Sequence, residues 1–298
     1  MALPPLPPIM IEPIVRAALL EDLGRAADLT SDAIIPFDAA ANMMIAARQP
    51  GVVAGLDVAV LTFRLVDPTI RLEVHRATGS AVAAGELIAT VSGPARGLLT
   101  AERTALNFLC HLSGIATATA ALVEAVRGHK AKIVCTRKTT PGLRALEKHA
   151  VRAGRGANHR FGLDDAILIK DNHIAIAGGI RPAVERARAY AGHMVRIEVE
   201  VDTLDQLEEV LALGVDAVLL DNMSLDDLAR AVRMVDGRAI TEASGRINVE
   251  TASAVAANGV DLISVGWITH SAPILDVALD VQVDGKPVIS VGSMERIE

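Results

Sequence analysis

The chain has 298 residues, a formal net charge of −7 and an apolar fraction of 51%, with aromatic residues at only 2%. This length suffices for one large domain or two smaller domains that each bury a core. The acidic balance argues against a general polyanion binder, and the scarcity of aromatic residues argues against single-stranded nucleic-acid binding. An apolar fraction built from Ala, Val, Leu and Ile is typical of helices packed on buried parallel strands.

The chain carries no predicted signal for export or for a membrane. Its first ten residues are Pro-rich and uncharged, unlike a signal peptide. No apolar run reaches the roughly 18–20 residues that span a bilayer. Cys110 and Cys135 lack CxxC spacing and have apolar neighbours, so we expect buried, reduced thiols. We therefore predict a cytoplasmic protein.

The first third of the chain predicts a small α+β domain over residues 1–112. Helical patterns cover residues 11–23, which Gly24 ends, and residues 101–112. Turn signals separate the β-like runs between them: 43–47, 52–54, 70–74 and 87–91. Further β-like residues at 281–283 and 288–291 predict that residues 275–298 join this domain.

From Lys132 onward, strand-like and helix-like segments alternate. The strand-like runs are 133–135, 166–169, 195–201, 217–220, 239–240 and 262–265. The helix-like runs are 143–151, 182–190, 204–213, 225–234 and 249–257. Thr203 with Gln206 fits a capping box, Ser224 fits an N-cap, and Gly214 and Gly259 suit helix ends. About six such units favour a mostly parallel (β/α) barrel over residues 113–274.

Polar residues accompany the end of almost every predicted strand of this barrel. They include Arg137, Lys170, Glu200, Asp221, Ser244 and His270. Loops are polar by default, so one such cluster could be ordinary solvated residues. In a barrel, however, the carboxyl ends of all strands converge on one mouth, where active sites are built. The repetition therefore favours a functional site at that mouth.

Basic residues are concentrated between Arg137 and Lys170, where eight Arg and Lys stand against three acids. This excess predicts a ligand with several negative groups. Arg pairs with carboxylates and phosphates through two parallel hydrogen bonds, while Lys acts as a point charge. The strongest candidates are Arg137, Lys138, Arg160 and Lys170. Three others have helical spacing and are expected to form a surface stripe: Arg144, Lys148 and Arg152.

Two carboxylates on neighbouring predicted strands, Glu200 and Asp221, offer oxygen ligands that suit Mg²⁺. Plain salt bridges with the bases across the mouth are the alternative at this point. Residues 242–245 before Asn248 predict backbone N–H groups and a helix N-terminus where a phosphate could bind. The chain has no GxxxxGK[ST], strand-linked GxGxxG or HExxH motif.

These residues fall in ordered motifs that resemble the quinolinate phosphoribosyltransferases. The motifs are TRKTTPG at 136–142, NHR at 158–160, LIKDNH at 168–173, EVEV at 198–201, LLDN at 219–222, EASG at 242–245, SVG at 264–266 and THS at 269–271. Upstream, EDLG at 21–24 and ERTALNF at 102–108 also match. The resemblance covers residues 12 to about 280.

The resemblance implies an N-terminal α/β sandwich, a mostly parallel α/β barrel and at least a homodimer. It implies transfer of phosphoribosyl from phosphoribosyl pyrophosphate to quinolinate, with release of CO2 and pyrophosphate, giving nicotinate mononucleotide for NAD biosynthesis. Mg²⁺ would be held by Glu200 and Asp221, which act with Lys138 in catalysis. The dicarboxylate would be bound by Arg137, His159, Arg160, Lys170 and, from the partner subunit, Arg103. Phosphoribosyl pyrophosphate would lie near Ser244, Gly245, Gly266 and His270.

Three residues depart from the family pattern: Arg155, Arg246 and Trp267 replace glycine or small residues. They motivate one alternative, a non-catalytic nucleotide-binding relative of the enzymes. A second alternative is a nicotinate-specific transferase, against which the surplus of cations argues. A third is a lyase that forms a Schiff base at Lys170. A lyase would need neither the cationic excess nor the paired acids.

Overall fold

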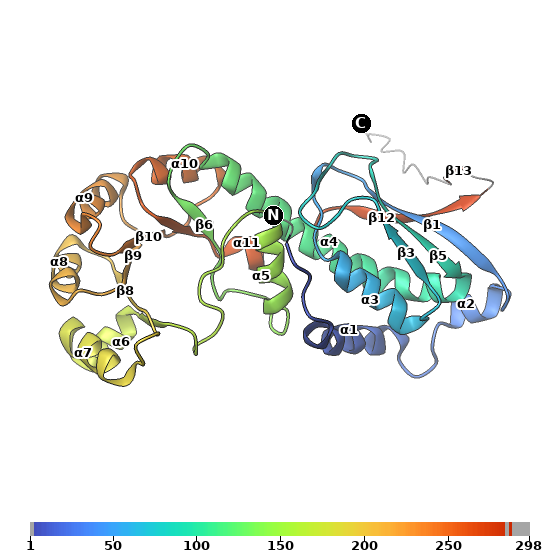
Figure 1. Cartoon of the computed structure of the whole chain (residues 1–298), viewed down its shortest axis with the longest axis horizontal. Helices are drawn as coiled ribbons and strands as arrows, with labels where there is room; N and C mark the ends of the chain where they lie inside the picture. Colours follow the sequence, from blue (N-terminus) through green and yellow to red (C-terminus); the bar gives the residue numbers. More distant parts are fainter. Residues whose placement is uncertain (1–2, 284–285, 288–298) are drawn as a thin grey trace, which may run out of the picture. The chain divides into compact units, whose positions relative to one another are not determined.

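The computed structural model describes residues 3–283 and 286–287, and the chain divides into two compact units (Figure 1). The first unit takes the chain up to Thr117 and from Pro273 onward, and the second covers Ala118–Ala272. The predicted boundaries, after residues 112 and 274, lie close to these positions.

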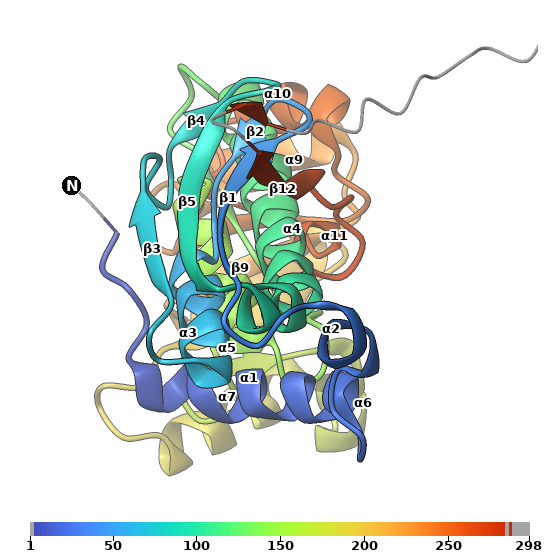
Figure 2. The same cartoon turned by 90° about the vertical axis from the view of Figure 1, so that its right-hand side faces the viewer.

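The first unit is built on an antiparallel sheet (Figure 2). Its strand order is β13 (Lys286–Pro287), β12 (Val277–Val283), β1 (Ala40–Ala47), β5 (Leu87–Pro94) and β3 (Arg71–Val74). A separate pair is formed by β2 (Gly51–Val52) and β4 (Ala81–Val82). The helices are α1 (Pro8–Leu23), α2 (Leu29–Ile34), α3 (Leu56–Val66) and the first part of α4 (Ala95–Ala125).

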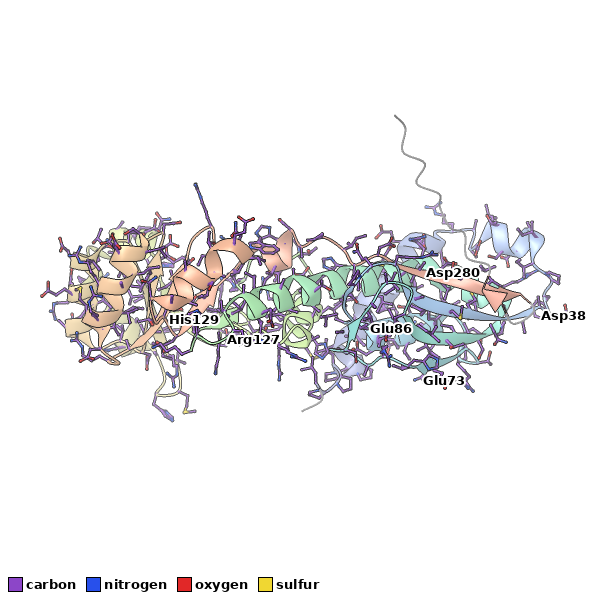
Figure 3. All side chains as sticks on the ribbon, turned by 90° about the horizontal axis from the view of Figure 1, so that it is seen from above. Asp38, Glu73, Glu86, Arg127, His129 and Asp280 are labelled. Atoms are coloured by element: carbon purple, nitrogen blue, oxygen red, sulfur yellow. The ribbon has the colours of Figure 1, made fainter. Side chains whose placement is uncertain are left out.

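The C-terminal strand returns to this sheet, as the sequence predicts. Val277–Val283 pairs with β1, placing Met43 opposite Val281 and Ala47 opposite Val277. Asp280 on this strand (Figure 3) also forms an ion pair with Arg48 at 3.0 Å. The predicted β-like run at 288–291 lies outside the described residues.

The core of the first unit lies between the sheet and helices α3 and α4. Phe63 from α3 and Leu109 from α4 join Ile45 and Ile88 from the sheet in one buried cluster. Burial of such side chains stabilises the fold by roughly 1.5–3 kcal/mol each. Helix α3 was not predicted, because its Val-rich sequence carries no cap signal.

Helix α4 is much longer than the predicted helix 101–112. The prediction ended before Gly114, but this glycine does not terminate the helix. A Cβ atom at Gly114 would lie 2.2 Å from the carbonyl oxygen of Pro273, so the glycine serves close packing. By length and composition α4 could span a membrane, contrary to the sequence-based expectation, but 67% of its most apolar window is buried inside the protein. It is thus a core helix.

The second unit contains a six-stranded sheet whose paired strands are all parallel. The order is β6 (Lys132–Val134), β11 (Leu262–Ser264), β10 (Ile240–Ser244), β9 (Ala217–Asp221), β8 (Ile197–Val201) and β7 (Ile167–Ile169). No described strand pairs β6 with β7, so the barrel ring is open between them. The predicted mostly parallel α/β architecture is confirmed.

Helices α8, α9 and α10 flank the outer side of this sheet in Figure 1. The helices of the unit are the end of α4, α5 (Arg144–Ala153), α6 (Asp171–Ala177), α7 (Ile180–Tyr190), α8 (Leu204–Leu213), α9 (Leu225–Val235), α10 (Val249–Ala257) and α11 (Trp267–His270). The predicted caps of Thr203 and Ser224 are confirmed, because each side chain accepts a backbone hydrogen bond at its helix start. Gly214 ends α8 in the left-handed conformation, at φ 67°.

Candidate active site

A cavity of about 360 Å³ opens at the carboxyl ends of the parallel strands. Eight residues predicted for the site line it: Arg137, Lys138, His159, Arg160, Lys170, Glu200, Asp221 and Ser244. The strand register explains part of this convergence, since Ser244 on β10 lies directly opposite Asp221 on β9. The structure thus brings these predicted cations and acids together around one cavity.

A second pocket of about 340 Å³ adjoins the first and shares Lys138, Asp221 and Ser244 with it. Its lining adds the other three predicted phosphate-side residues, Gly245, Gly266 and His270. Arg103 does not line either pocket. It is an exposed side chain on the part of α4 that belongs to the first unit.

The cationic wall of the cavity includes two neighbouring guanidinium groups, those of Arg137 and Arg160. Arg137 Nε is buried and has no hydrogen-bond partner among the described residues. Arg160 donates from Nη1 to the carbonyl oxygen of Ala166 at 3.1 Å. Burial, followed by the neighbouring Arg137 guanidinium, lowers the pKa of Arg160 from its usual value. Two guanidinium groups held together and partly desolvated are suited to a ligand with more than one carboxylate.

The acidic wall holds the two predicted metal ligands on adjacent strands. Glu200 on β8 forms an ion pair with Lys170, and Asp221 at the end of β9 accepts a hydrogen bond from Asn222 Nδ2 at 2.7 Å. Both side chains are partly exposed to the cavity. Carboxylate oxygens at rigid strand ends, facing a space open to water, are the donor set that suits Mg²⁺.

Comparisons with known proteins show the family of this chain. Residues 28–113 match the N-terminal domain of quinolinate phosphoribosyl transferase, and residues 115–280 match its C-terminal domain. The chain belongs to the quinolinate phosphoribosyltransferase family. It is 47% identical to a nicotinate-nucleotide pyrophosphorylase [carboxylating] of Mycobacterium leprae, over 90% of this chain and 95% of the relative. A probable enzyme of the same name from Bacillus subtilis is 43% identical over 94% and 96% of the two chains.

Solved structures of this family share the fold. The nicotinate-nucleotide pyrophosphorylase from Francisella tularensis superposes with a TM-score of 0.90 at 39% identity, covering 95% of this chain and 99% of the other. The match extends over both units, so the two-unit architecture is that of the family.

Lys148 departs from the sequence prediction for this phosphoribosyltransferase. It was expected on an exposed stripe, but it is only 1% exposed. Its Nζ donates to the carbonyl oxygen of His159 at 3.0 Å and to Cys135 Sγ at 3.1 Å. The prediction was wrong because α5 buries three consecutive side chains, Leu146 to Lys148, which helical spacing alone does not indicate. The buried ammonium group ties the loop that carries His159 and Arg160 to the end of β6.

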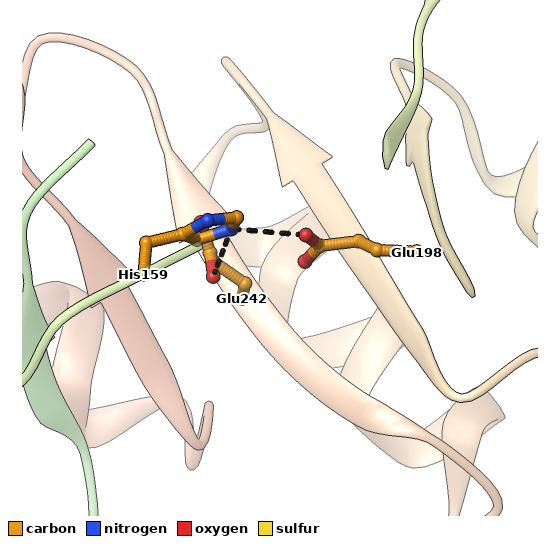
Figure 4. A group of neighbouring side chains, drawn as sticks. All are labelled: His159, Glu198 and Glu242. Atoms are coloured by element: carbon orange, nitrogen blue, oxygen red, sulfur yellow. Dashed lines mark hydrogen bonds and ion pairs between the residues drawn. The ribbon is translucent and has the colours of Figure 1, made fainter. Parts of the chain in front are cut away.

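His159 and Glu242, which both line the cavity, form a cluster with Glu198 (Figure 4). His159 Nε2 is 3.0 Å from Glu198 Oε2 and 3.4 Å from Glu242 Oε2. His159 Nδ1 accepts a hydrogen bond from the backbone N–H of Arg160 at 2.7 Å. Both ring nitrogens of His159 are therefore engaged by the protein itself.

Burial opposes ionisation throughout this cluster. Burial, and next the charge of Glu198, raise the pKa of Glu242 to about 7. Burial also disfavours the imidazolium, but the hydrogen bond to Glu198 and the two carboxylate charges outweigh it and raise the pKa of His159. Because the pKa values of both Glu242 and His159 are raised, the cluster as a whole retains a proton near neutral pH.

The second pocket, where the sequence predicts phosphate binding, requires a glycine at residue 245. Gly245 has φ 114°, and a Cβ atom there would lie 2.3 Å from Asn222 Oδ1. The sequence predicts that the N–H groups at the start of α10 could bind a phosphate. Two of these groups, those of Glu250 and Thr251, already donate to Asn248 Oδ1. Lys138 and His270, which line the pocket, remain as further partners for phosphate.

The three departures from the family pattern have distinct places in the structure. Arg155 and Arg246 are exposed and adopt left-handed conformations, at φ 68° and 48°, which glycine adopts without strain. Trp267 donates from Nε1 to the carbonyl oxygen of Ile247 at 3.0 Å and so fastens the phosphate-side loop. Arg246 and Trp267 both line the second pocket.

Sequence reasoning gave no role to Glu198 and Glu242, which the structure places beside His159. A signal was available for each. Glu198 is two residues before Glu200 on β8, and Glu242 is two residues before Ser244 on β10, so each side chain points to the same face of the sheet as its predicted neighbour. The prediction instead ended β10 at residue 240, which placed Glu242 in a loop.

Proposed function

We propose that this cavity transfers the phosphoribosyl group from phosphoribosyl pyrophosphate to the ring nitrogen of quinolinate and releases the 2-carboxylate as CO2. The products are nicotinate mononucleotide and pyrophosphate, a step of NAD biosynthesis. The observation that carries the proposal is the lining of one cavity by four cationic side chains and two strand-end carboxylates. The first set suits a dicarboxylate, and the second suits a metal-bound polyphosphate.

Arg137 and Arg160 would grip the two carboxylates of quinolinate and orient its nitrogen toward the anomeric carbon. The unpartnered Arg137 Nε supplies a donor that is ready for such an anion. His159 would act on the same ligand through Arg160, whose backbone N–H it holds at 2.7 Å. Its engaged ring nitrogens favour this positioning role over direct binding of a carboxylate.

The Lys170–Glu200 ion pair would couple the two substrates. A quinolinate carboxylate offers Lys170 a new partner, and Glu200 is then free for a cation. Glu200 and Asp221 would hold Mg²⁺, which supplies positive charge that stabilises the leaving pyrophosphate. The same two carboxylates favour the positive charge that develops on the ribosyl carbon. Lys138 lies where the two pockets meet and would stabilise the leaving group directly.

Ser244, Gly245, Gly266 and His270 would contact the phosphate groups from the second pocket. We further propose that the enzyme works in the cytoplasm as at least a homodimer, with Arg103 reaching the partner's quinolinate site. The exposure of Arg103 on α4 is consistent with a contact to a partner subunit.

The test is to supply quinolinate, phosphoribosyl pyrophosphate and Mg²⁺ and to measure pyrophosphate and CO2. We expect equal amounts of both, and loss of both when Mg²⁺ is withheld. Nicotinate in place of quinolinate should give little pyrophosphate, because one of two carboxylate contacts is missing. Equal kcat/KM for nicotinate would favour the nicotinate-specific alternative. Calorimetric binding without pyrophosphate release would favour a non-catalytic relative.

A further inference from the structure

The reaction proposed above requires a proton that its substrates do not bring to the reacting carbon. When CO2 leaves, the electron pair of the broken C–C bond remains on carbon 2, next to the positively charged ring nitrogen. This carbanion must take a proton to become the neutral C–H of nicotinate mononucleotide. A general acid in the cavity accelerates such a transfer by about 10²–10⁴-fold. The further inference rests on the proposed function.

We propose that Glu242, held as the neutral carboxylic acid in the floor of the cavity, is the proton donor to carbon 2. Its O–H bond breaks as the C–H bond forms, and the electron pair of the O–H bond stays on the carboxylate. A proton from solvent water restores the acid before the next turnover.

The first support is the burial of Glu242 without a hydrogen-bond partner. The side chain is 1% exposed, and neither Oε1 nor Oε2 has a hydrogen-bond partner among the described residues. An ionised carboxylate without donors is strongly disfavoured in such a place, so the group carries a proton instead. Glu242 is also among the residues that line the cavity.

The second support is the position of the other protons in the cluster. The backbone N–H of Arg160 points at His159 Nδ1, which must therefore be an unprotonated acceptor. The single ring proton on Nε2 is directed to Glu198, at 3.0 Å, rather than to Glu242, at 3.4 Å. His159 Nε2 is therefore engaged mainly by Glu198, and the charge of Glu198 is one of the causes that raise the pKa of Glu242.

Polar and charged groups on neighbouring elements offset the raised pKa of Glu242 only in part. The nearby Lys170 ammonium and the Ser264 hydroxyl on β11 favour the ionised form of Glu242. The Ser264 hydroxyl, however, donates to the carbonyl oxygen of Ala243 at 3.5 Å. Other charges line the cavity from the surrounding strand ends: Arg137, Lys138, Arg160, Glu200 and Asp221. Burial and Glu198 prevail, and the pKa of Glu242 rises to about 7.

The cationic residues are less suited to this role. Lys138 and Lys170 are exposed, and each would lose the charge that it contributes to substrate binding if it gave up a proton. Glu242 loses no attraction for the anionic ligands by being neutral before the transfer.

The experiment compares Glu242→Gln with the wild type in single turnover, measuring pyrophosphate and nicotinate mononucleotide separately. The amide keeps the shape of the acid but cannot release a proton. We expect pyrophosphate release within about tenfold of the wild type, since the cations are intact. Formation of nicotinate mononucleotide should fall by about 10²-fold or more. Glu242→Asp, which keeps an acid, should recover part of the loss.

Two controls separate this role from a structural one. Glu250→Gln, an exposed change at the start of α10, should leave both steps unchanged. The decarboxylation rate of the wild type should decline as the pH rises through about 7, and Glu242→Gln should lack that decline. A thermal melt verifies that each variant is folded.

Several results would overturn the assignment. Equal losses of both products in Glu242→Gln would make the residue structural, and unchanged formation of nicotinate mononucleotide would remove it from the chemistry. The three ligand atoms of the cluster lie within 4.8 Å of one another, so a cation could replace the proton. Zn²⁺ alone stabilising the wild type but not Glu242→Gln would indicate that case and contradict the acid role. No pyrophosphate release by the wild type would instead refute the proposed function.

Discussion

The retained proton of Glu242 predicts an unusual dependence of stability on pH. The pKa of this carboxyl group is about 7 in the folded chain, compared with an ordinary value of 4.5. The folded state therefore binds the proton more tightly than the unfolded state. Stability from this group is complete below about pH 4.5 and is lost as the pH rises through about 7.

The magnitude follows from the size of the shift. Each pKa unit corresponds to about 1.4 kcal/mol, so a displacement from 4.5 to about 7 amounts to at most roughly 3 kcal/mol. For a unit the size of residues 118–272, each kcal/mol moves the melting temperature by about 2–4 °C. Glu242→Gln removes the titrating group. The variant should melt near the wild type at pH 5 and several degrees above it at pH 8.5.

The assay is a series of thermal melts of both proteins between pH 5 and pH 9. Comparison at each pH cancels the titration of groups that the two proteins share. Glu250→Gln should follow the wild type throughout. Glu198→Gln should shift the pH dependence downward, because it removes a negative charge that raises the pKa of Glu242. A constant difference between Glu242→Gln and the wild type at all pH values would refute the proposed protonation.

Three further predictions concern the walls of the cavity and of the second pocket. Lys138→Ala should lower kcat by about 10²–10³-fold with little change in melting temperature, because the side chain is exposed, lines the cavity and is proposed to stabilise the leaving group. Unchanged turnover would remove it from the mechanism. Arg137→Lys should raise the KM for quinolinate by roughly tenfold or more, because lysine cannot form the paired hydrogen bonds of arginine. Steady-state kinetics with each substrate varied will show whether the effect is confined to quinolinate. Arg246→Gly should relieve a left-handed backbone at φ 48° and raise stability by up to about 1–2 kcal/mol. It should also weaken phosphoribosyl pyrophosphate binding, and calorimetry showing unchanged affinity would contradict a phosphate role for Arg246.

The sequence predicted the parts of the site that lie at strand ends. Lys170 and Asp221 follow apolar runs, and Glu200 lies next to the last residue of another predicted strand, so the parallel arrangement requires them to meet. The same logic predicted the helix caps at Thr203 and Ser224, because a cap is read from residues only three positions apart. Local spacing is sufficient for such features.

Features that depend on burial were not predictable in this way. Lys148 has the spacing of a surface residue, and only the packing of α5 against β6 and the loop at His159 explains its burial. A glycine such as Gly114 predicts the end of a helix. Only the close approach of Pro273 explains why Gly114 lies within α4. Both depend on contacts between residues that are distant along the chain.

The proton on Glu242 also has a consequence for substrate binding. Four cationic side chains line the cavity, and Glu200 and Asp221 are its other acids. With Glu242 neutral, the lining apart from His159 carries a net excess of two positive charges, and ionisation of Glu242 reduces that excess to one. A quinolinate dianion would then be bound less tightly in the same range of pH in which the proton donor is lost. The KM for quinolinate should therefore rise as decarboxylation slows, and in Glu242→Gln it should stay constant across pH 6–8. A rise of the same size in that variant would mean that another group controls binding.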